Sequence, residues 1–352
     1  MSATTDFFEN ADLERAILVG YYGGGNYGDE LLLEIIQNML KPKDYKQIQV
    51  AFQNPEQFGA YHHNFGHKVI AMNKPVQFLR GLTTSRSIVV GGGGLWGMDV
   101  NTNIVGLSLL LFLSRYILFK KVYLLGVGYY GSTSKAGRFA AWLVGKAANL
   151  VIARDAESLQ QFGKLTKHVV QDKDLAWLAK DLDLSAYEAE AQAIDQKLGV
   201  TGKSLLVTLR HFRGSLADQY HQQIGNFLAN NADKSIIIAL LQTAESYPEG
   251  SRLIQSWQQM YPNVRVLSGT LNPLAFFVFM QRRRHDIGLV APQFHAILTA
   301  SLNDIPFLPV AYDNKVFELF DQLGVPQGIH VQNLVPSDLQ LFADAFYAEG
   351  RA

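Results

Sequence analysis

The sequence contains no cysteine. Disulfide bonds, thiolate metal sites and cysteine nucleophiles are therefore excluded. The chain also has no excess charge of either sign, because 31 lysine and arginine residues balance 31 aspartate and glutamate residues. Non-specific binding to nucleic acid depends on excess positive charge, so a nucleic-acid partner is not expected, although a local basic patch is compatible with this balance.

Long apolar runs are missing as well. The most apolar stretch, residues 104–119, contains Arg115 and is followed by Lys120 and Lys121. It falls short of the roughly 18 to 20 apolar residues that a transmembrane helix needs. We predict a buried or docking helix there, with weak contact to a membrane surface as the alternative. Residues 1–12 have no basic segment, unlike a secretory signal, so a cytoplasmic protein is expected, either free or at the inner face of the membrane.

The 352 residues, 48% of them apolar and 18% charged, suffice for two globular domains with sizeable cores. Short apolar, β-branched runs alternate with helical patterns such as Leu32, Ile35, Ile36 and Met39, which recur at i, i+3, i+4 and i+7. Strands are predicted at Ala16–Tyr21, Ile48–Phe52, Lys68–Met72, Ser87–Val90, Val122–Gly126, Leu150–Ala153, His168–Val170, Ser204–Leu209, Ser235–Leu241, Val264–Leu267, Asp286–Val290 and Phe307–Val310. This alternation is typical of parallel sheets covered by helices on both faces.

Residues 181–202 interrupt the alternation, because they are rich in Ala, Gln, Asp and Glu and contain few large apolar residues. We predict a solvated helix and linker there. The fold class is therefore α/β, with two Rossmann-like domains that contain parallel sheets, at residues 1–180 and 203–352. The residues from 336 onward look helical and could pack on either domain.

Three glycine-rich turns follow predicted strands in the first half, at residues 20–30, 89–99 and 126–131. Glycines let backbone N–H groups approach a ligand, and a helix N-terminus favours an anion. Ligand crevices of such sheets lie at the carboxyl ends of the strands. Ligand contact is therefore predicted, with merely tight turns as the alternative. The first turn is neither a Walker A loop nor a GxGxxG motif in register.

Arg154, Arg210, His295 and Lys315 each lie just past a predicted strand. An arginine can hold a phosphate or a carboxylate by two hydrogen bonds, so this arrangement suits an acidic substrate that carries both groups. For Arg154, an ion pair with a carboxylate that follows it in the sequence is an equally good interpretation. A lone histidine is more often structural than catalytic. The basic cluster at residues 282–285 precedes a strand and is interpreted as solvated surface.

Together these residues resemble the polysaccharide pyruvyl transferase family. The matching segments, in chain order, are Gly20–Glu30, Gly92–Leu95, Gly126–Gly128, Arg154–Ser158 with Asp174, Arg210 at a Leu-Arg strand end, His295–Ile297 and Tyr312–Lys315. No single segment is specific, but the ordered set extends over nearly the whole chain and is much harder to obtain by chance.

The resemblance implies a glycosyltransferase-B-like fold with its active site in the cleft between the domains. It implies transfer of a pyruvyl group from phosphoenolpyruvate to two hydroxyls of a sugar in a cell-surface or exported polysaccharide, which gives a pyruvate ketal without a metal or nucleotide cofactor. Arg154, Arg210, Lys315 and Gln293 would bind this donor, and His295 would transfer protons. The other partner would be a glycan, either free or lipid-linked.

The sugar acceptor is expected at the glycine turns of the N-terminal domain, since aromatic faces pack on sugar C–H surfaces and backbone N–H groups bind hydroxyls. The alternative is that the aromatic residues belong to the core. The candidates are Gly23, Asn26, Asp29, Gly92, Gly93, Gly94, Trp96 and Tyr129, with Tyr21 and Tyr22 beside them.

Gln293 stands where the family has an arginine, and a neutral amide cannot replace that charge. Either Arg210, Arg154 and Lys315 suffice, or the donor differs, or activity is reduced. Two other functions therefore stay open. One is a nucleotide-sugar glycosyltransferase of the same fold, for which Glu318 is the nearby carboxylate that could bind ribose. The other is a catalytically silent relative that acts as a binding subunit.

Overall fold

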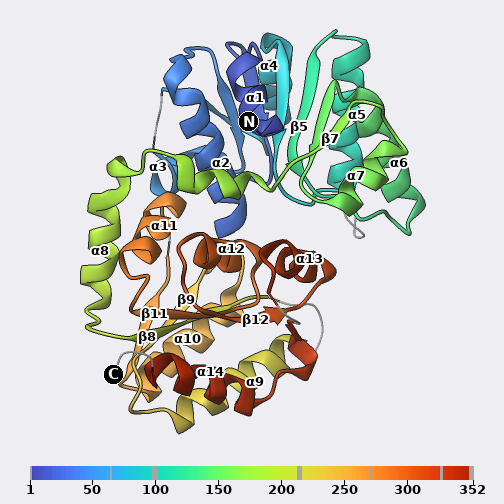
Figure 1. Ribbon diagram of the computed structural model, residues 1–352. Helices are drawn as coiled ribbons and strands as arrows, with labels where there is room; N and C mark the ends of the chain where they lie inside the picture. Colours follow the sequence, from blue (N-terminus) through green and yellow to red (C-terminus); the bar gives the residue numbers. More distant parts are fainter. Residues whose placement is uncertain are drawn as a thin grey trace. The chain divides into compact units, whose positions relative to one another are not determined.

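The computed structural model describes residues 2–63, 66–96, 102–211, 216–269, 271–325 and 328–348 (Figure 1). The chain forms two compact units. The first consists of Met1–Gly24 and Asp29–Leu182, and the second of Gly25–Gly28 and Asp183–Ala352. Each unit contains one parallel sheet with helices on both faces.

The sheet of the first unit has seven strands in the order β3-β2-β1-β4-β5-β6-β7. They are β1 (Ala16–Val19), β2 (Gln49–Phe52), β3 (Lys68–Ala71), β4 (Ser87–Gly91), β5 (Lys121–Val127), β6 (Leu150–Ala153) and β7 (Val169–Gln171). The central strands are buried along their length, as the apolar runs predicted, because helices cover both faces of the sheet.

The helices of this unit are α1 (Ala3–Asn10), α2 (Tyr27–Leu40, whose first two residues belong to the second unit), α3 (Phe58–Tyr61), α4 (Pro75–Thr84), α5 (Thr102–Tyr116), α6 (Lys135–Ala147) and α7 (Ala156–Gly163). Helices α4 to α7 pack on one face of the sheet and share a core cluster with its strands. Helix α1 packs on the other face, where the Phe7 and Tyr123 rings lie 4.9 Å apart. No described helix combines the length and the apolar character that crossing a bilayer would require.

The sheet of the second unit has the order β10-β9-β8-β11-β12-β13. Its strands are β8 (Ser204–Leu209), β9 (Ile236–Leu240), β10 (Val264–Leu267), β11 (Ile287–Ala291), β12 (Phe307–Ala311) and β13 (Ile329–His330). Strand β13 was not predicted, because two residues are too few to show a periodic pattern.

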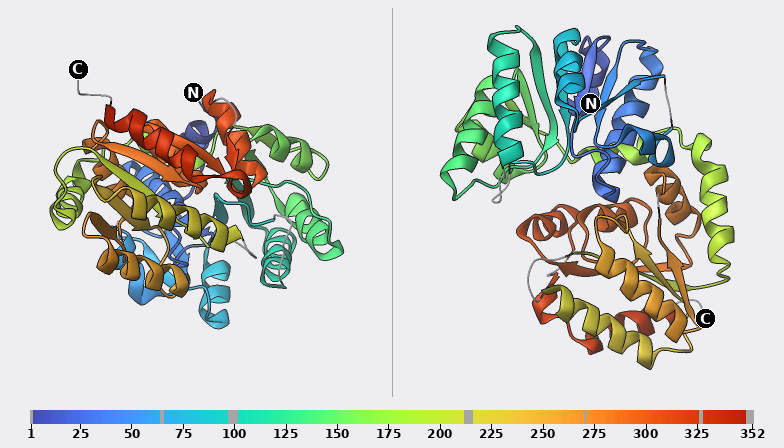
Figure 2. Two further views of the ribbon diagram at one scale, coloured as in Figure 1. Left: turned by 90° about the horizontal axis from the view of Figure 1, so that it is seen from below. Right: turned by 180° about the vertical axis from the view of Figure 1, so that it is seen from behind.

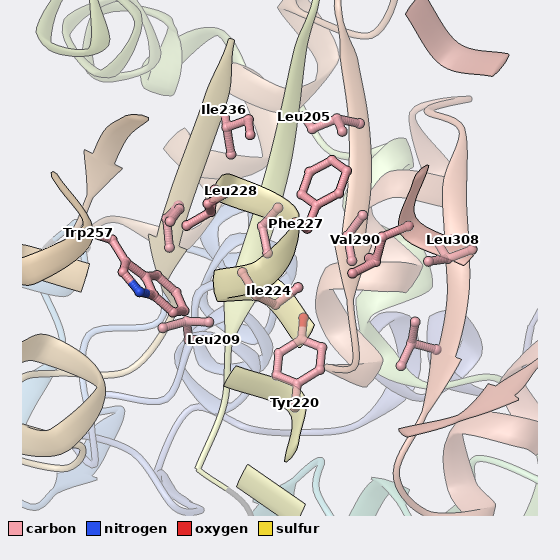
Figure 3. Close-up of a cluster of buried hydrophobic side chains, with 14 of the residues drawn as sticks. Leu205, Leu209, Tyr220, Ile224, Phe227, Leu228, Ile236, Trp257, Val290 and Leu308 are labelled. Atoms are coloured by element: carbon pink, nitrogen blue, oxygen red, sulfur yellow. The ribbon is translucent and has the colours of Figure 1, made fainter. Parts of the chain in front are cut away.

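The helices of the second unit are α8 (Glu188–Leu198), α9 (Leu216–Asn230), α10 (Pro248–Met260), α11 (Pro273–Arg282), α12 (Phe294–Leu302), α13 (Asn314–Leu323) and α14 (Pro336–Ala348). Helices α9, α10 and α14 enclose a core on one face, where Tyr220, Phe227 and Trp257 pack against strand residues (Figure 3). Helices α11 to α13 lie on the other face (Figure 1).

Within the predicted linker, α8 is a packed helix that contacts α11, and its Ala191, Ile194 and Leu198 are buried. Helix α14 contacts α9 and β11 of its own unit.

Both sheets have a doubly wound strand order, which reverses direction between β1 and β4 and between β8 and β11. In such sheets, ligands bind beyond the carboxyl ends of the strands at the point of reversal. The loops at these two edges are therefore the places to look for a site.

Candidate active site

At the carboxyl edge of the second sheet, two cations lie against one aromatic ring. Arg210 directly follows β8, and Tyr312 directly follows β12. The guanidinium carbon of Arg210 is 4.4 Å from the centre of the Tyr312 ring, and the Lys315 ammonium is 5.1 Å from it. Lys315 also lies 3.8 Å from the carboxylate of Asp313. The Nε atom of Arg210 is buried and makes no hydrogen bond to any described residue, so this site offers a desolvated cationic donor.

Gln293 connects this cation pair to helix α12. Its side chain is buried, its Oε1 accepts a hydrogen bond from the Thr208 hydroxyl, and its Nε2 donates to the Leu209 carbonyl oxygen at 2.7 Å. An arginine has no acceptor atom, so it could not receive the Thr208 hydroxyl proton. Both ends of the Gln293 carboxamide therefore hold the end of β8 against the start of α12, two residues before His295.

His295 lies against the first glycine motif. A Cβ atom placed on Gly28 would come within 2.1 Å of His295 Nδ1, so the imidazole occupies the space that a side chain would need. The loop Gly25–Gly28 is anchored in the second unit: the Tyr27 N–H donates to the Leu241 oxygen at 3.0 Å, and the Thr243 N–H donates to the Gly25 oxygen at 3.1 Å. The Tyr27 hydroxyl also hydrogen bonds that of Thr299 at 2.8 Å.

The glycine turn at residues 20–30 was predicted to belong to the N-terminal domain as a whole. In the structure, Gly23 and Asp29 lie in the first unit, whereas Asn26 lies in the second, where it forms a β-bridge with Gln242. No local pattern in the sequence marks this division, because it depends on contacts with residues more than two hundred positions away.

The other glycine turns meet at the carboxyl edge of the first sheet. The Gly92 N–H donates to the Leu125 oxygen at 2.7 Å, and the Gly128 N–H donates to the Gly93 oxygen at 2.9 Å. At Gly92 a Cβ atom would meet the Leu32 side chain at 2.1 Å, so packing explains this glycine. At Gly94 the nearest described neighbour of such an atom is 4.0 Å away, so backbone there is open to a ligand.

A neutral pocket of about 660 Å³ lies beside these turns, beyond the ends of β1, β2 and β3. It is lined by Gly20, Tyr21, Gln53, Met72, Asn73, Pro75, Phe78, Leu95, Asn103, Ile104, Gly106, Leu107 and Leu110. None of these residues is charged. Three carboxamides supply polar groups, and Tyr21 and Phe78 supply aromatic rings. Such a pocket suits an uncharged ligand rich in hydroxyl groups.

Of the aromatic residues proposed to bind a sugar, only Tyr21 lines this pocket. Trp96 is 0% exposed, belongs to the core beneath α5, and donates its indole N–H to the Ser108 hydroxyl at 2.9 Å. Tyr22 and Tyr129 are buried as well. For these three residues the structure shows the core alternative, because their ring faces are packed against protein.

Arg154 forms a compact ionic cluster in the first unit. Its Nη1 donates to Asp174 at 3.1 Å, its Nη2 donates to the Tyr130 hydroxyl at 3.2 Å, and its Nε is 3.6 Å from Asp155. Burial by itself would lower the pKa of Arg154, but Tyr130, Asp174 and Asp155 outweigh it and raise this pKa. The guanidinium is 5% exposed and has two carboxylates beside it, the neighbouring Asp155 and the more distant Asp174. Arg210 and Lys315 lie together in the second unit, and Arg154 belongs to the first unit.

A second buried network, which the sequence patterns did not reveal, supports the Gly23 turn. His62 hydrogen bonds Glu30 through Nε2 at 2.9 Å and Glu34 through Nδ1 at 2.6 Å. Glu30 also accepts the Gly23 N–H at 2.9 Å. Burial would lower the pKa of His62, but the hydrogen bonds and charges of the two glutamates outweigh it and raise this pKa.

This raised pKa predicts a pH-dependent stability. A histidine whose pKa is higher in the folded state stabilises the fold fully below its unfolded pKa of about 6.5, and this contribution is lost as the pH rises through the folded value. The free energy of unfolding should therefore exceed that of a His62→Gln variant most in mildly acidic buffer, and the difference should shrink in alkaline buffer. Urea titrations across pH measure it, with exposed His168→Gln as the control. A difference that stays constant with pH would contradict the charged state of His62.

In the described part of the chain, no group of three or more histidine and acidic side chains is arranged to hold a metal ion.

Comparison with known proteins identifies the family of this chain. A family model described as polysaccharide pyruvyl transferase matches residues 26–314, which is most of the chain. The chain belongs to the polysaccharide pyruvyl transferase family. The match includes Arg210, Gln293 and His295 and ends one residue before Lys315. A search of curated proteins found no match.

Solved structures share the fold of this chain. The UDP-GlcNAc 2-epimerase of Methanocaldococcus jannaschii has a TM-score of 0.61 at 12% identity, over 96% of this chain and 93% of that chain. MnaA of S. aureus, solved with UDP, has a TM-score of 0.59 at 14% identity, over 95% and 90%. The E. coli ADP-heptose LPS heptosyltransferase II has a TM-score of 0.50 at 12% identity, over 96% and 100%. These likenesses confirm the glycosyltransferase-B-like fold.

Proposed function

We propose that this pyruvyl transferase moves the pyruvyl group of phosphoenolpyruvate onto two hydroxyls of one sugar in a cell-surface or exported polysaccharide, forming a pyruvate ketal. Membership of the family supports the transfer of a pyruvyl group. The observation that carries the choice of donor is the Arg210–Lys315 pair on the Tyr312 ring, at the sheet edge where α12 presents His295.

The chemistry of the pair fits phosphoenolpyruvate. The donor carries a phosphate and a carboxylate, and arginine and lysine bind such groups through charge-assisted hydrogen bonds. The N-cap residues of α12 and α13, Gln293 and Asp313, make no capping hydrogen bond. The positive ends of two helix dipoles therefore add to the attraction for an anion.

His295 is the proposed proton-transfer group. The methylene carbon of the donor gains a proton while the first sugar hydroxyl adds to the neighbouring carbon and loses its own. The second hydroxyl then displaces phosphate from that carbon, and its proton leaves with the phosphate. One proton must therefore be moved to carbon and two must be removed from oxygen, and histidine exchanges protons near neutral pH.

We place the sugar in the neutral pocket of the first unit. Carboxamides of Gln53, Asn73 and Asn103 can donate to and accept from hydroxyl groups, and the half-exposed Tyr21 ring can pack on sugar C–H bonds. Gly94, at the neighbouring turn, leaves backbone open to the ligand. The absence of charge in the described lining suits an acceptor that is uncharged before the transfer.

The test is release of phosphate from phosphoenolpyruvate in the presence of candidate glycans. We expect glycan-dependent release, and we expect Arg210→Ala to raise the KM for phosphoenolpyruvate by roughly 10- to 100-fold, the value of one charge-assisted hydrogen bond of about 1.5–3 kcal/mol. Lys315→Ala should raise it less, since its ammonium is shared with Asp313. The matched control is Arg252→Ala, at an exposed position of α10.

Nucleotide sugars are the competing donors to include, because structural neighbours such as MnaA were solved with UDP. Transfer from a UDP-sugar without phosphate release from phosphoenolpyruvate would overturn the proposal in favour of a glycosyltransferase. No turnover with either donor would favour a binding subunit.

A further inference from the structure

Exposed apolar side chains gather on one side of the first unit. More than half of the large apolar residues that are exposed in the described chain lie on α5, on α6 and in the turn after α5. This aromatic face consists of Leu109, Leu113, Tyr116, Ile117, Leu118, Phe119, Phe139 and Trp142. Surface apolar residues are normally scattered, so a contiguous group indicates an interaction surface.

The aromatic face is an ordered surface. Helices α5 and α6 pack side by side, as both views of the first unit show (Figures 1 and 2). The Phe112 ring lies 4.7 Å from Tyr116 and 6.0 Å from Trp142, and Phe139 stacks on Trp142 at 6.1 Å. The Tyr116 hydroxyl donates to the Lys146 oxygen at 3.0 Å across the two helices. Even so, Phe139 is 51% exposed and Trp142 is 43% exposed.

The turn after α5 projects one more ring. Phe119 is 83% exposed and has a φ of 53°. Left-handed backbone is unfavourable for a residue with a bulky side chain, so the turn holds Phe119 in a strained conformation with its ring in solvent.

The segment that forms the aromatic face carries charge of one sign. The sequence has no Asp or Glu from residue 100 to residue 154, although acidic and basic residues balance over the whole chain. Lys121, Lys135, Arg138 and Lys146 are exposed in this part of the first unit, and Arg115 is half-buried. Within this segment the aromatic face is accompanied by cations and by no carboxylate, which makes it complementary to anionic lipid headgroups over an apolar interior.

We propose that the aromatic face docks on the surface of an anionic lipid bilayer. Tryptophan and tyrosine favour the headgroup region, and lysine and arginine reach lipid phosphates from beside it. A second copy of the chain is a poorer partner. If two copies met through this face, their cations would repel one another, and residues 100–154 contain no carboxylate that could pair with them. Since no described helix can cross a bilayer, this contact is peripheral.

Helix α5 links this surface to the neutral pocket. Ile104, Leu107 and Leu110 line the pocket, while Leu109 and Leu113 on the same helix belong to the aromatic face. Docking would therefore hold the pocket beside the bilayer. The docking itself does not depend on the proposed reaction.

Sedimentation of the full chain with lipid vesicles tests the proposal. We expect binding to vesicles of phosphatidylcholine mixed with phosphatidylglycerol, weak binding to phosphatidylcholine alone, and loss of binding as salt rises. Phe119→Glu, and the double variant Lys121→Glu with Arg138→Glu, should each weaken binding by roughly tenfold or more, because they remove apolar contact or reverse charge at the lipid surface. Leu341→Glu on α14 is the matched control, since it adds the same charge at an exposed leucine of the other unit.

Unchanged melting temperatures will show that the variants are folded, because these side chains are exposed. Absence of binding to the anionic vesicles would overturn the proposal, and so would binding that the aromatic-face variants leave intact. The proposal would also be overturned if the chain did not bind vesicles but self-associated, and if Phe119→Glu abolished that self-association. The aromatic face would then be an interface between copies of the chain. The assay uses no substrate, so its failure would leave the proposed reaction untouched.

Discussion

Replacing His295 by alanine should lower the turnover number with phosphoenolpyruvate by roughly 10² or more while donor affinity stays nearly intact, as expected for loss of a general acid–base. The reason is that ketal formation needs a proton delivered to carbon and protons removed from two hydroxyls. Steady-state kinetics of phosphate release gives the turnover number, and calorimetric titration of phosphoenolpyruvate gives the affinity.

A variant of Gly28 tests the role of His295 independently. Gly28→Ala would place a methyl group 2.1 Å from His295 Nδ1, which is far inside van der Waals contact, so the imidazole must move. Turnover should fall while the chain remains folded. Gly225→Ala on α9 is the matched control, because a Cβ atom there would meet Trp257 at an ordinary 3.6 Å.

The alternatives for His295 have distinct outcomes. Lost donor binding with residual turnover at saturating phosphoenolpyruvate would assign His295 to binding of the phosphate. Full activity of His295→Ala would remove it from the site.

The second large effect is expected on stability. Asp174→Ala should lower the free energy of unfolding by about 3 kcal/mol or more, because removing one partner of a buried ion pair leaves charge uncompensated. Arg154 would lose one of the two carboxylates beside it, and the Ala176 N–H would lose the side chain that caps the short 3₁₀ helix Leu175–Asp181. Urea unfolding measures the effect, and Asp181→Ala at an exposed position is the control.

This experiment also decides the role of Arg154, which the family resemblance would give to donor binding. A variant of unchanged stability whose KM for phosphoenolpyruvate rises would return Arg154 to the donor site. A stability loss with an unchanged KM would establish it as a structural residue that holds the ends of β5 and β6 together.

Gln293, which stands where the family has an arginine, has a structural role in the unit that contains His295, Arg210 and Lys315. The Gln293 carboxamide bridges Thr208 and Leu209, so the position supports the end of β8. An arginine at position 293 would supply a positive charge, but it could not accept the hydrogen bond that the Thr208 hydroxyl donates to Gln293. The cation pair on Tyr312 is present without it.

Much of the fold was predictable from the sequence. The strands of both sheets produce apolar runs because helices bury both of their faces, and the intervening helices show the 3.6-residue period of one buried side. The order of the family motifs could also be recognised in the sequence, because glycines and charged residues lie where strands end. Two doubly wound units and a pyruvyl transferase resemblance followed from these local signals.

Only the tertiary structure decided which side chains meet. Trp96 follows a glycine run that suits a ligand site, yet α5 covers it. In the sequence Arg154 resembles a residue that binds phosphate, but in the structure its charge is paired with that of Asp174, which follows the next strand. Gly28 contacts His295, and Arg210 shares an aromatic ring with Lys315, across long separations in sequence. The physical reason is that local periodicity records whether a residue is buried, whereas the identity of its partner depends on strand order and on the paths of the loops.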